Sequence, residues 1–159
     1  MFIYERMETG MKAELSEQLA LLNQNDKQMD DLYHHYALRL GISDTVLWIL
    51  YITYTQGDGL TQKEICALWA YSKQTINTAL KHLEAEGILA LTPVEGNRKS
   101  KRIVFTERGR QYARETIEPL VRAEMTSLKK MSEEERELLV NLSLKWTALF
   151  QHELEKVKN

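Results

Sequence analysis

The sequence has 159 residues, of which 43% are hydrophobic and 28% charged, with a formal net charge of −2. These values are ordinary for a soluble globular protein, and no apolar run approaches the roughly 20 residues that a membrane-spanning helix needs. The N-terminus has no apolar core of signal-peptide length, and the single cysteine cannot form an internal disulfide. We therefore expect a single cytoplasmic domain, residues 1–159, with no cofactor and no membrane association.

Charge is divided unevenly along the chain. Residues 61–110 hold nine Lys or Arg and five Asp or Glu, a net of +4, so the remaining residues carry a net of −6. A basic segment in an otherwise acidic chain attracts a polyanion to one surface and repels it from the others. The distribution of charge therefore favours nucleic-acid binding by the middle of the chain.

The first 57 residues predict two helices. Apolar residues recur at spacings of three and four over residues 7–40, as in an amphipathic helix. The polar stretch 23–26 marks either a kink or an exposed turn of one long helix. Gly41 ends this segment, and Ser43 caps a second helix that is apolar on nearly all sides up to Gly57. We expect the second helix to lie in the core.

Two short helices are expected in immediate succession after the second one. Thr61 and Glu64 form a capping-box pattern, which predicts that the first short helix begins at Leu60 or Thr61. Ser72 is suited to cap the next helix, and Gly87 supplies its C-terminal stop. Abutting short helices of this kind are typical of a helix-turn-helix.

The second short helix has one apolar face and one polar face. On the polar face Gln and Asn can pair bidentately with adenine, Thr can offer a hydroxyl or a methyl group, and Lys can reach guanine or phosphate. We expect base edges to be read by Gln74, Thr75, Asn77 and Thr78. We expect phosphates to be held by Thr61, Ser72, Lys73 and Lys81.

A short basic hairpin follows the two helices. Residues 88–94 and 101–105 are predicted to be strands, joined by the turn Glu95-Gly96-Asn97. A basic β tip beside a two-helix reader is typical of a wing. Its candidate DNA contacts are Asn97, Arg98, Lys99 and Lys101.

Two long helices are expected after the hairpin. Thr106 caps the first, which runs to Met131 and contains Pro119, a residue that should kink it by removing one backbone hydrogen bond. Ser132 and Glu135 form a second capping box at the start of the last helix. The last helix and the first of the chain carry long apolar stripes, so we expect them to pair with the same helices of a second copy.

The stretch SKQTINTALKHLEAEGIL, followed by the basic hairpin and then FTERGR, resembles the winged helix-turn-helix of the MarR family of bacterial transcription regulators. The resemblance covers roughly residues 40 to 115. It implies a mainly α fold with a small β-hairpin wing. It also implies a winged helix-turn-helix head at residues 41–116. Two helical dimerisation arms, residues 1–40 and 117–159, are expected on either side of the head.

The chain departs from that family at three places. Ala70 stands where Gly is often found, and Val46-Leu47 where Gln-Phe is frequent. Asn97-Arg98-Lys99 replaces the usual Asp-x-Arg of the wing. The missing acid leaves open which of Arg98 and Lys99 enters the minor groove, and the position of Arg98 at the turn exit favours Arg98.

The resemblance implies a sequence-specific regulator that binds double-stranded DNA. We expect a homodimeric repressor on an inverted-repeat operator, relieved by a small-molecule effector. The alternative is a protein-interaction adaptor that keeps the winged fold without DNA binding. The sequence shows no Ser-His-Asp set, Gly-rich phosphate loop or paired carboxylates, so we expect no enzyme activity.

Aromatic side chains gather where the first helix meets the second. Regulators of this family often bind small aromatic or phenolic effectors in such a cleft, and the alternative is that these residues fill the core. The candidate effector residues are Tyr36, Arg39, Trp48 and Tyr51.

No metal site is expected. The adjacent residues His34 and His35 point about 100° apart on a helix and cannot readily share one ion. Cys66 is interpreted as an inert core thiol in preference to a redox switch.

Overall fold

The computed structural model describes residues 2–57, 59–69, 72–94 and 96–157, and it describes side chains within these ranges except at 2–11, 68–69 and 97–99. The described residues form six helices and a small antiparallel sheet, as the sequence predicts. The chain divides into two compact units, residues 1–113 and 114–159. The N-terminal helix falls in the same unit as the head, whereas the division into one head and two arms stays a prediction.

The first two helices meet at a tight turn. Helix α1 (Phe2–Leu40) is continuous through the polar stretch 23–26, which is therefore an exposed turn of one long helix. It ends at Gly41, whose φ of 69° is a left-handed conformation that favours glycine. The Ser43 side chain accepts a hydrogen bond from the Val46 N–H at 3.3 Å and so caps α2 (Asp44–Gln56).

Helix α2 is the core of the first unit. The side chains of Leu47, Ile49 and Leu50 are completely buried, which confirms the expectation from its nearly all-round apolar pattern. Thr53 is also buried in α2, and its hydroxyl donates to the Ile49 carbonyl at 2.7 Å, so this polar group has a hydrogen-bond partner.

The helix-turn-helix begins one residue later than expected, because Leu60–Thr61 form a short strand, β1, that pairs with β3. The capping box is present nevertheless. Thr61 N–H donates to the Glu64 carboxylate at 2.6 Å, and α3 (Gln62–Trp69) starts after it. The prediction of a helix start at Leu60 or Thr61 is therefore wrong, since β1 was not recognisable in two residues without its partner strand.

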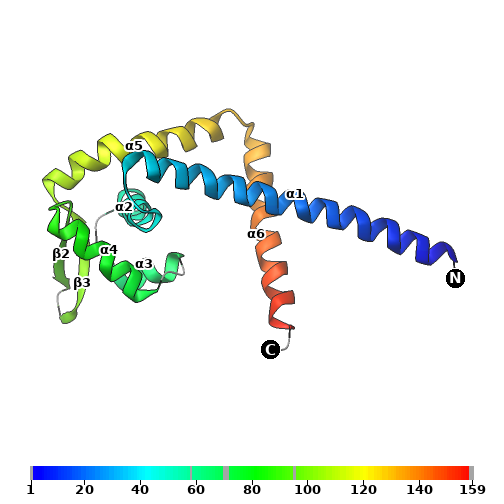
Figure 1. The fold of residues 1–159 in the computed structure, drawn as a ribbon, viewed down its shortest axis with the longest axis horizontal. Helices are drawn as coiled ribbons and strands as arrows, with labels where there is room; N and C mark the ends of the chain where they lie inside the picture. The colour runs from blue at the N-terminus through cyan, green and yellow to red at the C-terminus, as the bar shows by residue number, and fades with distance from the viewer. Residues whose placement is uncertain (1, 58, 70–71, 95, 158–159) are drawn as a thin grey trace. The chain divides into compact units, whose positions relative to one another are not determined.

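Helix α4 (Lys73–Ala85) and the strands β2 (Leu89–Val94) and β3 (Asn97–Phe105) complete the head (Figure 1). The strands have the order β1-β3-β2 in the sheet. Strand β3 begins four residues earlier than predicted. The register moves from Pro93 opposite Lys101 to Val94 opposite Asn97, so residues 98–100 are inserted into the ladder. Such an irregularity bends the strand and re-aims its side chains.

The FTERGR motif joins the end of α4 to the start of α5 (Glu107–Lys129). The Thr106 hydroxyl donates to the Gly87 carbonyl at 2.6 Å and accepts from the Gly109 N–H at 2.9 Å. Thr106 N–H donates to the Ile88 carbonyl at 3.1 Å. The predicted cap at Thr106 and the predicted stop at Gly87 are thus parts of one hydrogen-bonded junction.

The second unit contains the rest of α5 and α6 (Glu133–Glu155). Both halves of the Ser132–Glu135 capping box are formed. Helix α5 continues through Pro119 and ends two residues before the expected Met131, and the kink at Pro119 stays a prediction. No residue of α6 is buried.

Large apolar side chains are exposed along α1 and α6. Those of α1 include Leu15, Leu19, Leu22, Met29 and Leu32. Those of α6 include Leu138, Leu139, Leu142, Trp146, Leu149, Phe150 and Leu154. Within the described ranges, none of the helices has a stretch long and apolar enough to cross a membrane.

Gly109→Ala should destabilise the first unit. A Cβ at position 109 would lie 1.8 Å from the Ile88 carbonyl oxygen, so the first turn of α5 or the strand start must shift. We expect a loss of about 1–3 kcal/mol in the free energy of unfolding, as for other overpacked sites. Urea unfolding would measure it, with Glu107→Ala, an exposed site in the same turn, as the control. Equal stability of both variants would contradict a tight contact at Gly109.

Candidate nucleic-acid interface

Helix α4 presents a polar face to solvent. Its inner face consists of the buried residues Ile76, Ala79, Leu80 and Leu83. Its exposed side chains include Lys73, Gln74, Thr75, Asn77, Thr78 and Lys81. The structure therefore places all six of these candidate residues on one accessible side of a helix that is anchored by its other side.

The start of α4 is held by hydroxyl groups and by α3. Ser72 Oγ accepts from the Thr75 N–H at 3.1 Å and lies 2.7 Å from Thr75 Oγ1. Gln62 of α3 donates from Nε2 to the Lys73 carbonyl at 2.9 Å. With no acidic residue in the first turn, this end of α4 suits a phosphate oxygen.

One flank of α4 borders a basic cavity of about 650 Å³ between α3, α4 and β3. The four lysines in its lining are Lys63, Lys73, Lys81 and Lys101, and Glu84 is the acid that accompanies them. The candidates Thr61 and Asn77 line the same cavity. The fold thus brings lysines from three separate elements, α3, α4 and β3, to one positively charged hollow.

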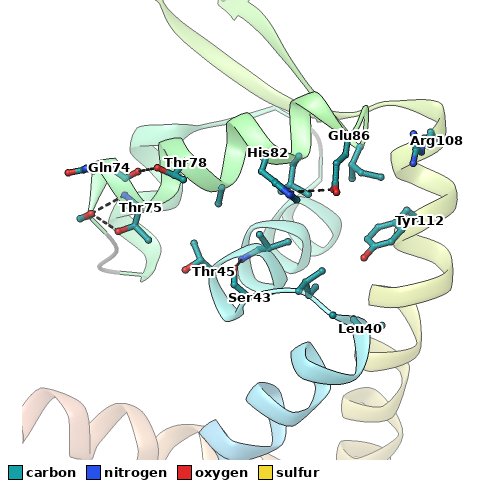
Figure 2. Close-up of a pocket in the computed structure, with 17 residues that line it drawn as sticks. Leu40, Ser43, Thr45, Gln74, Thr75, Thr78, His82, Glu86, Arg108 and Tyr112 are labelled. Carbon is teal, nitrogen blue, oxygen red and sulfur yellow. Dashed lines mark hydrogen bonds and ion pairs between the residues drawn. The ribbon is translucent and has the colours of Figure 1, made fainter.

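The other flank of α4 borders a larger cavity, about 870 Å³ (Figure 2). Gln74, Thr75 and Thr78 reach it from α4, and Thr45 lies across from them at the start of α2. Ser72 also lines it. Helix α4 is therefore a ridge between two hollows, with candidate residues on both sides.

Ionisable groups gather at the far end of the larger cavity (Figure 2). His82 Nδ1 lies 3.6 Å from a Glu86 carboxylate oxygen. Tyr112 and Arg108 of α5 lie nearby in the lining. Burial, and to a lesser degree the charge of Glu86, raise the pKa of the Tyr112 hydroxyl.

Of the four wing candidates, Lys101 is the one whose side chain the structure describes. The side chains of Asn97, Arg98 and Lys99 lie outside the described residues, although their backbone belongs to β3. Lys101 is exposed at the wing root and lines the basic cavity. Lys63, which sequence reasoning missed, lines it too, and its position inside the Thr61–Glu64 capping box could have indicated it.

The effector candidates lie where α1 meets α2. Trp48 is 4.7 Å from Tyr33 and 5.5 Å from Tyr51, measured between ring centroids. The Arg39 guanidinium lies 5.0 Å above the Tyr36 ring. Trp48 also lines a cavity of about 450 Å³. The lining of that cavity is largely acidic, with Asp30, Asp31 and Asp44 beside Lys27 and His34.

Cys66 is half-buried and lines the basic cavity, so it is less buried than a core thiol, and its expected inertness stays a prediction. The position follows from the short α3, whose buried anchor is the neighbouring Ile65. Across the part of the chain that the structure describes, no group of three or more His, Cys, Asp or Glu is arranged to hold a metal ion.

A helix pair followed by a β hairpin, with the second helix exposed on its polar side, defines a winged helix-turn-helix protein. Residues 40–100 match the model of the MarR family. No curated protein sequence matches the chain.

Solved structures of MarR regulators share the fold. NMB1585, a MarR family regulator from Neisseria meningitidis, has a TM-score of 0.73 and 21% identity over 89% of this chain and 99% of that one. S. aureus MepR in its DNA-binding conformation has a TM-score of 0.68 and 22% identity, covering 81% and 96%. The S. aureus MepR-DNA complex has a TM-score of 0.60 and 23% identity, covering 81% and 95%.

Residues 40–100 are therefore similar to the MarR family model, and the described residues share the fold of solved MarR family regulators.

Proposed function

We propose that the chain is a DNA-binding transcriptional regulator that reads a specific double-stranded DNA sequence with α4 and represses transcription until an effector releases it. The observation that carries the proposal is the exposed polar face of α4, flanked by a hollow that four lysines line. Positive charge beside a helix that can enter the major groove attracts the DNA backbone and brings side chains to the base edges. The complex of the related S. aureus MepR with DNA supports the same use of the fold.

Two groups of residues divide the work in this proposal. Gln74, Thr75, Asn77 and Thr78 read base edges. Thr61, Ser72, Lys73, Lys81 and Lys101 bind phosphates, because they lie at the start of α4 and around the basic cavity. At the wing tip Arg98 enters the minor groove, because a guanidinium suits a narrow and negative groove. Asn97 lies beside it in sequence, and Lys99, like Lys101, binds a phosphate.

The proposed regulator is a homodimer. Helix α6 has no buried residue, yet it exposes a stripe of large apolar side chains, and α1 exposes a second stripe. Apolar surface of this extent is costly in water and is normally covered by a partner. A two-fold pair of chains would place two copies of α4 about one DNA turn apart on an inverted repeat.

The proposed effector lodges near Trp48, between α1 and α2. Aromatic rings and a cavity occur together there, and Tyr36, Arg39 and Tyr51 lie on the same two helices. A ligand changes DNA affinity only when it prefers one arrangement of the protein over another. The adaptor alternative gains no support from the four-lysine cavity, which suits a polyanion better than a neutral protein surface.

Asn77→Ala and Lys81→Ala should weaken DNA binding differently. Loss of a bidentate base contact costs about 1–3 kcal/mol at one base pair, whereas loss of a phosphate contact weakens all sequences alike. The affinities of both variants would be measured on DNA selected from a random pool and on a scrambled duplex. If both variants lose the same factor on both duplexes, the division of labour is wrong. If the wild-type protein selects no sequence, the proposed function is wrong.

Leu142→Glu combined with Phe150→Glu should dissociate the homodimer. Both side chains are about half exposed in the single chain, at 53% and 54%, so the change is tolerated in the monomer but sets like charges against each other in a paired seam. Sedimentation should show a monomer with weakened DNA binding. Gln151→Glu on another face of α6 is the control. A wild-type protein that sediments as a monomer at micromolar concentration and binds a half-site tightly would contradict the dimer.

Trp48→Phe should abolish the optical response to an effector. Titration with a panel of phenols, aromatic acids and aromatic amines should change the fluorescence of the wild type and lower its DNA affinity in parallel. Amines belong in the panel because carboxylates line the neighbouring cavity. Trp146→Phe, on α6, should keep the response. A response that survives in Trp48→Phe would place the effector elsewhere, such as the cavity beside α4.

A further inference from the structure

Arg102 of β3 and Gly59 form a two-point connection in the head. The Arg102 guanidinium donates from Nη1 to the Gly59 carbonyl at 3.0 Å. The Gly59 N–H donates to the carbonyl of Ile103, the next residue of β3, at 3.0 Å. Both backbone polar groups of Gly59 are therefore bound to neighbouring residues of one strand. We call this arrangement the Gly59 clasp.

Position 59 is suited to glycine for two reasons. Its φ of 116° lies in a region that side chains with a Cβ rarely adopt. A Cβ at this position would also lie 3.2 Å from Arg102 Nη1, which is closer than an ordinary contact. A side chain at position 59 would therefore crowd the Arg102 guanidinium.

Arg102 also lies close to the start of α3. It is opposite Thr61 in the β1–β3 pairing. The Thr61 N–H and hydroxyl donate to the Glu64 carboxylate at 2.6 and 2.7 Å. These two hydrogen bonds are the main reason that the pKa of Glu64 is lowered, and the nearby charge of Arg102 adds to them. One side chain of the wing root therefore faces the cap of the first reading helix.

Lys101 and Arg102 have different surroundings although they are adjacent. Successive residues of a strand point to opposite faces. Lys101 and Ile103 line the basic cavity beside α4, whereas Arg102 is bonded to Gly59. Strand β3 thus places Lys101 at the basic cavity proposed to bind DNA, whereas Arg102 forms a hydrogen bond within the protein.

We propose that Arg102 is a positioning residue of the DNA interface: through the Gly59 clasp it holds β3, and with it the wing, at a set place beside α3. It does not bind a phosphate. The inference rests on the proposed DNA-binding function, because it concerns the position of the wing in the DNA complex. It distinguishes the cations of the wing that contact phosphates, Lys101 among them, from Arg102, which has a structural role.

The salt dependence of DNA binding distinguishes a residue with a structural role, such as Arg102, from a residue that contacts a phosphate, such as Lys101. Each phosphate contact that is lost lowers the slope of log Kobs against log salt concentration by roughly 0.9. Lys101→Ala should therefore lower this slope. Arg102→Ala should leave the slope unchanged while reducing affinity by roughly three- to tenfold at every salt concentration, the equivalent of one net hydrogen bond.

A double-mutant cycle and hydrogen exchange test the clasp itself. Gly59→Ala changes no charge, yet it should reduce affinity as Arg102→Ala does, and the double variant should lose little more than either single one. In the free protein, Arg102→Ala should speed exchange of the Gly59 amide, and Lys101→Ala should not. If Arg102→Ala does not fold, Arg102→Lys, which keeps the charge without the planar fork, takes its place with the same readouts.

The proposal is overturned if Arg102→Ala lowers the salt slope as Lys101→Ala does, if the losses from Gly59 and Arg102 simply add, or if Gly59 exchange is unchanged. A wild-type protein that binds none of the selected DNA contradicts the proposed function instead. The exchange of the Gly59 amide in the free protein still decides whether the clasp exists in that case.

Discussion

The hydrogen bonds of Thr106 connect the segment that ends α4 to the first turn of α5. Its hydroxyl donates to the carbonyl at the end of α4 and accepts the N–H of Gly109 in the first turn of α5. Since Gly109 has no Cβ, the helix backbone approaches the Ile88 carbonyl directly. The segments that join α4, β2 and α5 are therefore held together by hydrogen bonds at one junction.

The polar surface of the head depends on this anchoring. Helix α2 supplies a completely buried apolar centre, and the inner face of α4 is buried as well, so α4 is anchored by that face while its outer face is exposed. Side chains that read bases must be held by elements that do not move. Gln62 adds a second constraint by binding the Lys73 carbonyl at the start of α4. The wing needs a comparable restraint at its root, and Arg102 is the residue whose bonds suit that role.

The two units of the chain have different relations to solvent. The first buries a complete apolar core around α2. The second leaves the apolar stripe of α6 exposed, including the stacked pair Trp146 and Phe150, whose ring centroids are 5.8 Å apart. Folding of a single chain thus buries the apolar core of the head, but it leaves α6 with exposed apolar surface that favours association. The proposed function assigns recognition to the head, and it assigns pairing to α1 and α6 because both helices expose large apolar side chains.

The sequence by itself determined the helices, their caps and the polar face of α4, because capping and periodicity act over a few residues and leave local signals. Ser43, Ser72, Thr106 and Ser132 all cap helices where their side chains predicted it. Only the tertiary structure decided what joins residues distant in the chain. Strand β1, the extra residues inserted in β3 and the bond from Arg102 to Gly59 arise from pairing with a partner segment, which no local pattern encodes.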